Sequence, residues 1–216
     1  MKLKYFLLAL YFIPSICSAE INNISVMATD SDAFKNPYIK NTEQLAMILS
    51  GQKKQVYTLS EATGLSATFI KTMAQRKGNL TTISYDSKNA FTCPQNKPCP
   101  TIQTQVAQDF EDAVYKLFTY SDSIVFLPGS FNVMYAFNYL QVLEKQKEIN
   151  YKPIVFLNTN HYFERFRQML VEMNRQKVIS DAVFNTIVFE NKPEGVLKSL
   201  QKTQQQIQTY IKQEKL

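Results

Sequence analysis

The stretch from residue 123 to residue 137 could carry phosphate chemistry. It reads SIVFLPGSFNVMYAF, an apolar run that passes through Pro-Gly into a helical pattern. Backbone N–H groups at the start of such a helix bind anions, and Gly129 would let a ligand approach the backbone closely. The amide groups expected to point at a phosphate are those of Ser130, Phe131, Asn132 and Val133. No Asp or Glu occurs between Gly129 and Leu143, so this segment brings no acid or base of its own.

Strand-like and helical patterns alternate along the rest of the chain. The predicted strands are 21–27, 55–59, 79–85, 123–127, 152–158 and 186–190, and the predicted helices are 41–51, 62–78, 104–120, 131–146, 162–176 and 193–215. This alternation indicates crossover connections and a parallel sheet. The runs SIVFL and PIVFL lack polar alternation, which is typical of strands covered on both faces. We therefore predict an α/β fold: a single doubly wound Rossmann-like domain with a mostly parallel sheet flanked by helices.

The predicted sheet places several polar loops at one edge. In open parallel sheets, ligands bind beyond the carboxyl ends of the strands. Three such ends carry small polar residues, at 27–33, 58–67 and 127–133, and the second and third also carry a glycine. The strand 152–158 ends at the same edge. The candidate ligand-binding residues are Thr29, Ser31, Ser60, Gly64, Gly129, Ser130, Phe131, Asn132, Val133 and Asn158.

Taken together, these loops resemble the LOG (Lonely Guy) family, also called lysine decarboxylase-like or MoCo carrier-like, over roughly residues 23–202. The family signature Pro-Gly-Gly-x-Gly-Thr-x-x-Glu corresponds to PGSFNVMYA at 128–136, and the segment KPIVFLN at 152–158, followed by Tyr162 and Phe163, matches best. The resemblance implies a Rossmann-like fold and a phosphoribohydrolase that cleaves nucleoside 5′-monophosphates. It also implies a homodimer with sites at the subunit interface.

The departures from that family fall on the catalytic positions. Ala136 stands where the family has its catalytic Glu, and Ala113 stands where it has an Arg. We therefore expect a catalytically impaired protein that binds a nucleoside monophosphate or another phosphate-containing ligand. Glu61, on the second loop, is the best replacement carboxylate for an alternative in which hydrolysis persists, although it could equally be an acid that stabilises a helix N-terminus. The third alternative is an interaction protein that retains only the fold.

The N-terminus predicts export. Residues 1–19 combine Lys2 and Lys4 with a short apolar run and a small-residue ending, as in a cleaved signal peptide. The apolar run is too short to span a bilayer, so no stable membrane span is expected after cleavage. Residues 20–216 would then form the domain, in the periplasm or secreted. In an oxidising compartment Cys93 and Cys99, within a Pro- and Cys-containing excursion at 86–102, are expected to form a disulfide, with a metal or redox site as the alternative.

Composition argues against several partners. Loss of Lys2 and Lys4 lowers Lys+Arg from 24 to 22 against 18 Asp+Glu, so the net charge falls from +6 to an unremarkable +4. The basic residues between 165 and 177 are spaced as a solvated helix face, so we predict no nucleic acid partner. The only histidine, His161, is remote in sequence from the cysteines, so no metal site is expected. No residue pattern indicates a cofactor.

Overall fold

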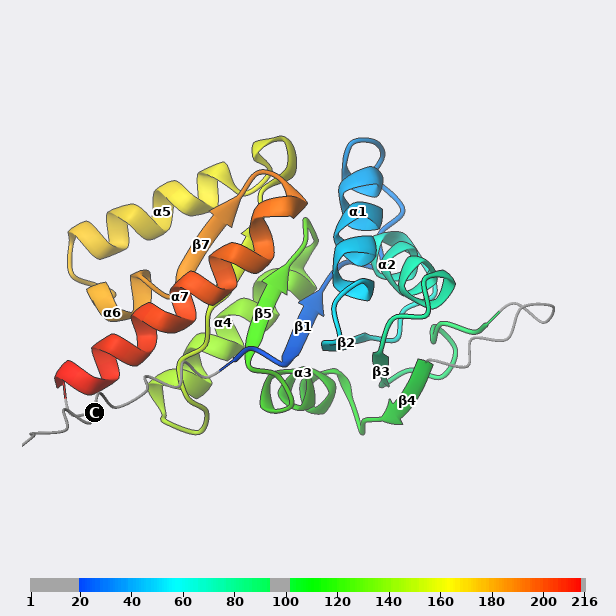
Figure 1. Ribbon diagram of the computed structural model, residues 1–216, viewed down its shortest axis with the longest axis horizontal. Helices are drawn as coiled ribbons and strands as arrows, with labels where there is room; N and C mark the ends of the chain where they lie inside the picture. Colours follow the sequence, from blue (N-terminus) through cyan, green and yellow to red (C-terminus); the bar gives the residue numbers. More distant parts are fainter. Residues whose placement is uncertain (1–19, 94–101, 215–216) are drawn as a thin grey trace, which may run out of the picture.

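The computed structural model describes residues 20–93 and 102–214, with side chains to residue 211. Its described part contains a seven-stranded, all-parallel sheet in the order β4-β3-β2-β1-β5-β6-β7 (Figure 1). The strands are β1 Asn23–Met27, β2 Gln55–Leu59, β3 Leu80–Ser84, β4 Ile102–Val106, β5 Ser123–Phe126, β6 Ile154–Leu157 and β7 Ile187–Glu190. The strand order reverses direction between β1 and β5, which is the switch point of a doubly wound fold. The predicted fold class is confirmed.

Helices cover both faces of the sheet, as the unalternating apolar strands predicted. The helices are α1 Tyr38–Ser50, α2 Gly64–Gln75, α3 Phe110–Thr119, α4 Phe131–Lys145, α5 Glu164–Arg175, α6 Asp181–Phe184 and α7 Pro193–Glu214, with a 3₁₀ turn η1 Thr159–His161. One buried cluster joins the sheet to α3, α4 and α5, and the other joins it to α1, α2 and α7. Successive residues of β5 alternate between them, since Ile124 and Phe126 pack in the first and Val125 in the second.

The prediction was wrong at residues 102–106. This segment was divided between an irregular excursion and the start of a helix, but it forms the edge strand β4, paired in parallel with β3 from Leu80↔Ile102 to Ser84↔Val106. Its sequence IQTQV is polar, and its side chains are largely exposed because, of these residues, only Ile102 packs against a hydrophobic cluster. Helix α3 begins later, after Asp109, whose carboxylate accepts a hydrogen bond from the Asp112 N–H at 2.8 Å.

Two sequence predictions lie partly or wholly outside the described residues. Residues 1–19 are among these, so the signal peptide and export stay predictions. Cys99 also lies outside, so its pairing with Cys93 stays a prediction. Across residues 20–93 and 102–214, no helix is both long enough and apolar enough to cross a membrane.

Candidate functional site

The carboxyl ends of β1 and β5 bring two of the predicted loops together. Met27 and Phe126 are register partners at the ends of these adjacent strands. Just beyond them, the Thr29 hydroxyl donates a hydrogen bond to the Ser130 hydroxyl across 3.4 Å. The Thr29 loop and the Gly129 loop therefore meet at the switch point of the sheet, as the sequence predicted.

The second loop, after β2, is fastened to the first. The Thr63 hydroxyl donates to the Asp30 carbonyl at 2.6 Å, and the Ser66 N–H donates to the Thr29 carbonyl at 3.0 Å. Gly64 adopts φ +67°, and a Cβ on it would lie only 2.5 Å from the Thr29 carbonyl oxygen. Glycine is required here because the two loops pack backbone against backbone.

A carboxylate of the chain already occupies the N-terminus of α2. The Gly64 N–H donates to Asp32 Oδ1 at 3.0 Å. A helix N-terminus attracts negative charge, and Asp32 supplies that charge from the first loop. Gly64 was predicted to contact a ligand, but its amide is used within the protein and its main role is the close packing of the loops.

The N-terminus of α4 is more open. The Val133 N–H donates to the Ser130 carbonyl at 3.1 Å, and the Val133 side chain is fully buried. A Cβ on Gly129 would come within 2.2 Å of Val133 Cγ2, so the valine fills the space above the glycine. Within the described part of the chain, the N–H groups of Phe131 and Asn132 meet no backbone acceptor. The Ser130 N–H likewise meets no backbone acceptor there, so three of the four predicted amide donors are open and the one of Val133 is not. The Phe131 ring beside them is 92% exposed.

The remaining predicted ligand residues serve the chain in other ways. Buried Asn158 accepts from the Phe163 N–H at 2.7 Å through Oδ1 and donates to Asn191 Oδ1 at 3.2 Å, so both ends of its amide hold the turn after β6. Ser31 Oγ accepts from the Ala33 N–H at 3.3 Å. Tyr162, which follows the segment that best matches the family, donates a hydrogen bond from its hydroxyl to the Gly129 carbonyl at 2.7 Å and so holds the loop before α4.

A separate cavity of about 110 Å³ lies beyond the ends of β2 and β3. Its polar lining consists of Asp30, Ser60, Glu61, Thr63, Tyr85, Asp86 and Asn89. The Glu61 side chain is 3% exposed, and its Oε1 accepts from the Tyr85 hydroxyl at 3.4 Å. Among the described residues, Glu61 Oε2, Ser60 Oγ and Ser66 Oγ have no hydrogen-bond partner. Each such buried polar group costs about 1–3 kcal/mol when nothing satisfies it.

Burial changes the acidity of the two groups that meet in this cavity. It raises the pKa of Glu61 to about 7. The Ser66 and Tyr85 hydroxyls oppose that rise and the charge of Asp30 adds to it, although Ser66 Oγ does not reach hydrogen-bond geometry with the carboxylate. Burial also raises the pKa of Tyr85 far above its ordinary range, with the Glu61 charge as the second cause. Glu61 can therefore gain or lose a proton near neutral pH, as a general acid or base must.

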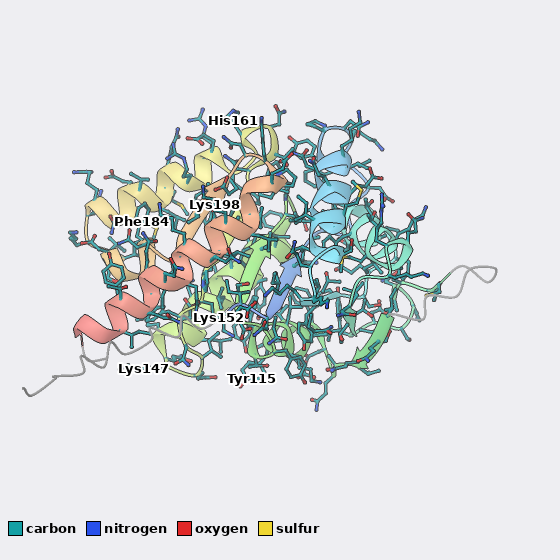
Figure 2. All side chains as sticks on the ribbon, in the orientation of Figure 1. Tyr115, Lys147, Lys152, His161, Phe184 and Lys198 are labelled. Carbon is teal, nitrogen blue, oxygen red and sulfur yellow. The ribbon has the colours of Figure 1, made fainter. Side chains whose placement is uncertain are left out.

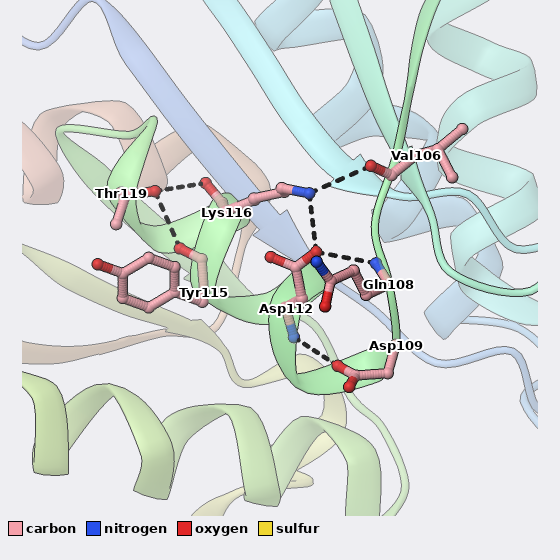
Figure 3. A network of polar contacts seen from close by, with 7 residues as sticks. All are labelled: Val106, Gln108, Asp109, Asp112, Tyr115, Lys116 and Thr119. Atoms are coloured by element: carbon pink, nitrogen blue, oxygen red, sulfur yellow. Dashed lines mark hydrogen bonds and ion pairs between the residues drawn. The ribbon is translucent and has the colours of Figure 1, made fainter.

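The positions of the family's catalytic Glu and Arg carry no chemistry. Ala136 on α4 and Ala113 on α3 are both 0% exposed and pack in the same hydrophobic cluster. The nearby acid Asp112 is engaged elsewhere: it accepts from the Gln108 N–H and forms an ion pair with Lys116, both at 2.8 Å (Figure 3). Asp112 therefore does not replace the missing pair at the α4 N-terminus.

A second buried carboxylate, Glu144, lies at the opposite end of the strands, where they begin. Its Oε1 accepts from the Lys152 N–H at 3.0 Å, just before β6 begins, whereas His161 follows the end of β6 (Figure 2). Burial raises the pKa of Glu144 to about 8. In the described part of the chain, no group of three or more His, Cys, Asp or Glu side chains is arranged to hold a metal ion.

Comparison with known proteins agrees with this architecture. A protein-family model described as possible lysine decarboxylase matches residues 88–200. The fold is similar to that of the molybdenum cofactor binding protein of Rippkaea orientalis, with a TM-score of 0.60 and 14% identity over 85% of this chain and 98% of that one. It is also similar to the protein TM1055 (TM-score 0.63, 14% identity, 84% and 99% covered) and to the Moco carrier protein of Chlamydomonas rheinhardtii (0.59, 12%, 85% and 98%). No curated protein matches the sequence.

Proposed function

Because the chain belongs to the family described as possible lysine decarboxylase, we propose that it is an exported, catalytically impaired member that binds a nucleotide or another phosphate-containing ligand. The observation that carries the binding proposal is the open N-terminus of α4. There the amides of Phe131 and Asn132 lack backbone acceptors, and the hydroxyls of Thr29 and Ser130 meet beside them. Two proteins of similar fold are a molybdenum cofactor binding protein and a Moco carrier protein, which supports a small ligand as the class of partner.

The groups at the α4 N-terminus can bind both the phosphate and the base of a nucleotide. Free amides at a helix N-terminus and nearby hydroxyls are donors to phosphate oxygens. The Phe131 ring is almost wholly exposed at the same helix start. An aromatic side chain in that position can stack on a nucleobase. The proposed ligand therefore places its phosphate on α4 and its base against Phe131.

Loss of turnover follows from the side chains that replace the family's catalytic pair. Cleavage of a glycosidic bond passes through an oxocarbenium-like transition state that a nearby carboxylate assists. At positions 113 and 136 the protein has buried methyl groups. We therefore propose binding without efficient hydrolysis.

The binding proposal is tested by Ser130→Asp. Aspartate is a good N-cap residue, so α4 should persist, while its charge would repel a phosphate at the same place. AMP, inorganic phosphate and adenosine are titrated into residues 20–216, with Ser180→Asp at the N-cap of α6 as the matched control. We expect Ser130→Asp to weaken AMP and phosphate binding by at least about tenfold, with adenosine little affected. Equal AMP affinity in both variants, or no AMP binding to the wild type, would contradict the proposal.

A second candidate function rests on Glu61. Its burial and a pKa of about 7 are properties of a general acid. If a nucleotide reached from α4 into the Glu61 cavity, this carboxylate could take the place of the missing Glu. Release of free base from a nucleoside 5′-monophosphate, lost in Glu61→Gln, would establish that function.

Export and dimerisation complete the proposal. A mature protein that begins at Glu20, recovered outside the cytoplasm, supports export, whereas cytoplasmic protein that retains Met1 opposes it. A homodimer is supported by the partly exposed Tyr115, Tyr135 and Val142 on α3 and α4, which leave apolar surface uncovered. Sedimentation of the mature protein distinguishes the dimer from a monomer.

A further inference from the structure

The cavity around Glu61 is lined by hydrogen-bond acceptors that receive few hydrogen bonds from the protein. Two oxygens at its wall, Glu61 Oε2 and Ser60 Oγ, are buried and without a partner among the described residues. A third unpartnered oxygen, Ser66 Oγ, belongs to a residue that does not line the cavity. Buried polar atoms in native proteins nearly always have partners, so two unpartnered oxygens on lining residues of one cavity indicate that something outside the chain completes them.

The charge of the cavity identifies the class of group that fits. Asp30, Glu61 and Asp86 line it, and no lysine or arginine does so in the described part of the chain. Asp86 already accepts from the Lys88 N–H at 2.9 Å and from Asn89 Nδ2 at 2.7 Å. Among the described residues, Glu61 receives only the long hydrogen bond from the Tyr85 hydroxyl. The cavity of about 110 Å³ exceeds the roughly 30 Å³ of one water in the liquid, so it holds a group of a few atoms.

We propose that this cavity is a binding site for an organic ammonium or guanidinium group. Such a group supplies several N–H donors and a positive charge, and so satisfies the Glu61 carboxylate and the Ser60 hydroxyl at once. A divalent metal fits less well, because the described residues offer no group of three or more His, Cys, Asp or Glu side chains in metal-binding geometry. The cavity lies beyond β2 and β3, and its lining residue Asp30 adjoins Thr29 of the α4 phosphate corner. The inference does not depend on phosphate binding.

The cation can come from a free amine or from a lysine or arginine side chain of another protein. A protein-observed NMR titration at pH 8 separates these sources with four probes. n-Butylammonium and n-butylguanidinium carry the proposed group, 1-butanol has the same chain without charge, and N-acetyl-lysine methylamide presents the ammonium as a peptide does. We expect saturable binding of the cations at millimolar concentration and none of butanol. Tighter binding of the acetyl-lysine probe than of butylammonium points to a protein partner, and the reverse order to a small amine.

The matched pair Glu61→Gln and Glu144→Gln tests the location. Both residues are buried glutamates with raised pKa values, but Glu144 lies at the amino-terminal edge of the sheet. Removing the charged acceptor should weaken n-butylammonium binding by about tenfold or more in Glu61→Gln and leave it unchanged in Glu144→Gln. Equal binding of butanol and butylammonium, unchanged affinity in Glu61→Gln, or equal loss in both variants would overturn the proposal.

Discussion

Glu61→Gln should reveal how strongly the folded protein resists ionising its buried carboxylate. Burial raises the pKa of Glu61 from 4.5 to about 7. Below pH 4.5 the carboxyl group is neutral in both the folded and the unfolded chain. As the pH rises toward about 7, the unfolded chain ionises freely while the folded chain retains the proton, so the stability that the neutral group provides is lost. Glutamine has the same shape and no charge, and it escapes this loss.

The size of the effect follows from the shift of about 2.5 pKa units. At 1.36 kcal/mol per unit, the free energy of unfolding of the wild type should fall by about 3 kcal/mol relative to Glu61→Gln between pH 4.5 and pH 8. Most of that fall should occur below pH 7, because the folded protein itself ionises above that pH. The substituted glutamine still offers an oxygen to the Tyr85 hydroxyl, so the variant should not lose that bond.

Urea unfolding at pH 5, 6, 7 and 8, with linear extrapolation to water, measures the difference. Glu144→Gln is the matched control, and since burial raises the pKa of Glu144 to about 8, its difference should keep growing for about one pH unit more. An equal difference in the free energy of unfolding between wild type and Glu61→Gln at pH 5 and pH 8 would contradict this expectation, because Glu61 would then ionise in the folded protein as it does in water.

Two further predictions concern the packing of the loops and position 136, where the family has its catalytic Glu. Gly64→Ala should lower the free energy of unfolding by more than about 2 kcal/mol, because the backbone φ is +67° and the added Cβ would collide with the backbone of Asp30 and Thr29. Gly51→Ala should be nearly neutral, because the nearest atom to its Cβ would be 3.5 Å away. Equal thermal stability of the two variants would contradict the loop packing. Ala136→Glu should lower the free energy of unfolding by more than about 3 kcal/mol and restore no base release, because position 136 lies in the hydrophobic core. Asn138→Glu, on the exposed side of α4, should be tolerated. A stable and active Ala136→Glu variant would contradict this prediction and show that the helix turns to present the carboxylate.

The sequence predicted most of the fold because each central strand is a short apolar run with a physical reason to be buried. SIVFL and PIVFL have no polar face, so helices had to cover both sides, and two core clusters do so. The edge strand β4 was missed because IQTQV buries little and carries no apolar pattern. The one-turn helix α6 was missed for a similar reason, since its stability comes from the Ser180 cap and tertiary packing rather than from periodicity.

The site was predictable in place but not in detail. Loop positions follow from strand order, and the Thr29 and Gly129 loops do meet. The partners of individual atoms depend on contacts between distant segments: Asp32 reaches the α2 amide, Val133 fills the space above Gly129, and Asn191 takes the Asn158 amide. Glu61 was weighed as a dipole-stabilising acid, yet Asp32 has that role, and Glu61 is buried in a cavity of its own.

We propose that the protein retains LOG-type ligand binding at the carboxyl ends of its strands but does not catalyse the hydrolytic reaction. The most direct test incubates residues 20–216 at high concentration with a panel of nucleoside 5′-monophosphates and quantifies free base by chromatography, beside Glu61→Gln. We expect no base release above background from either protein. Release by the wild type that disappears in Glu61→Gln would contradict it and would identify Glu61 as the replacement carboxylate.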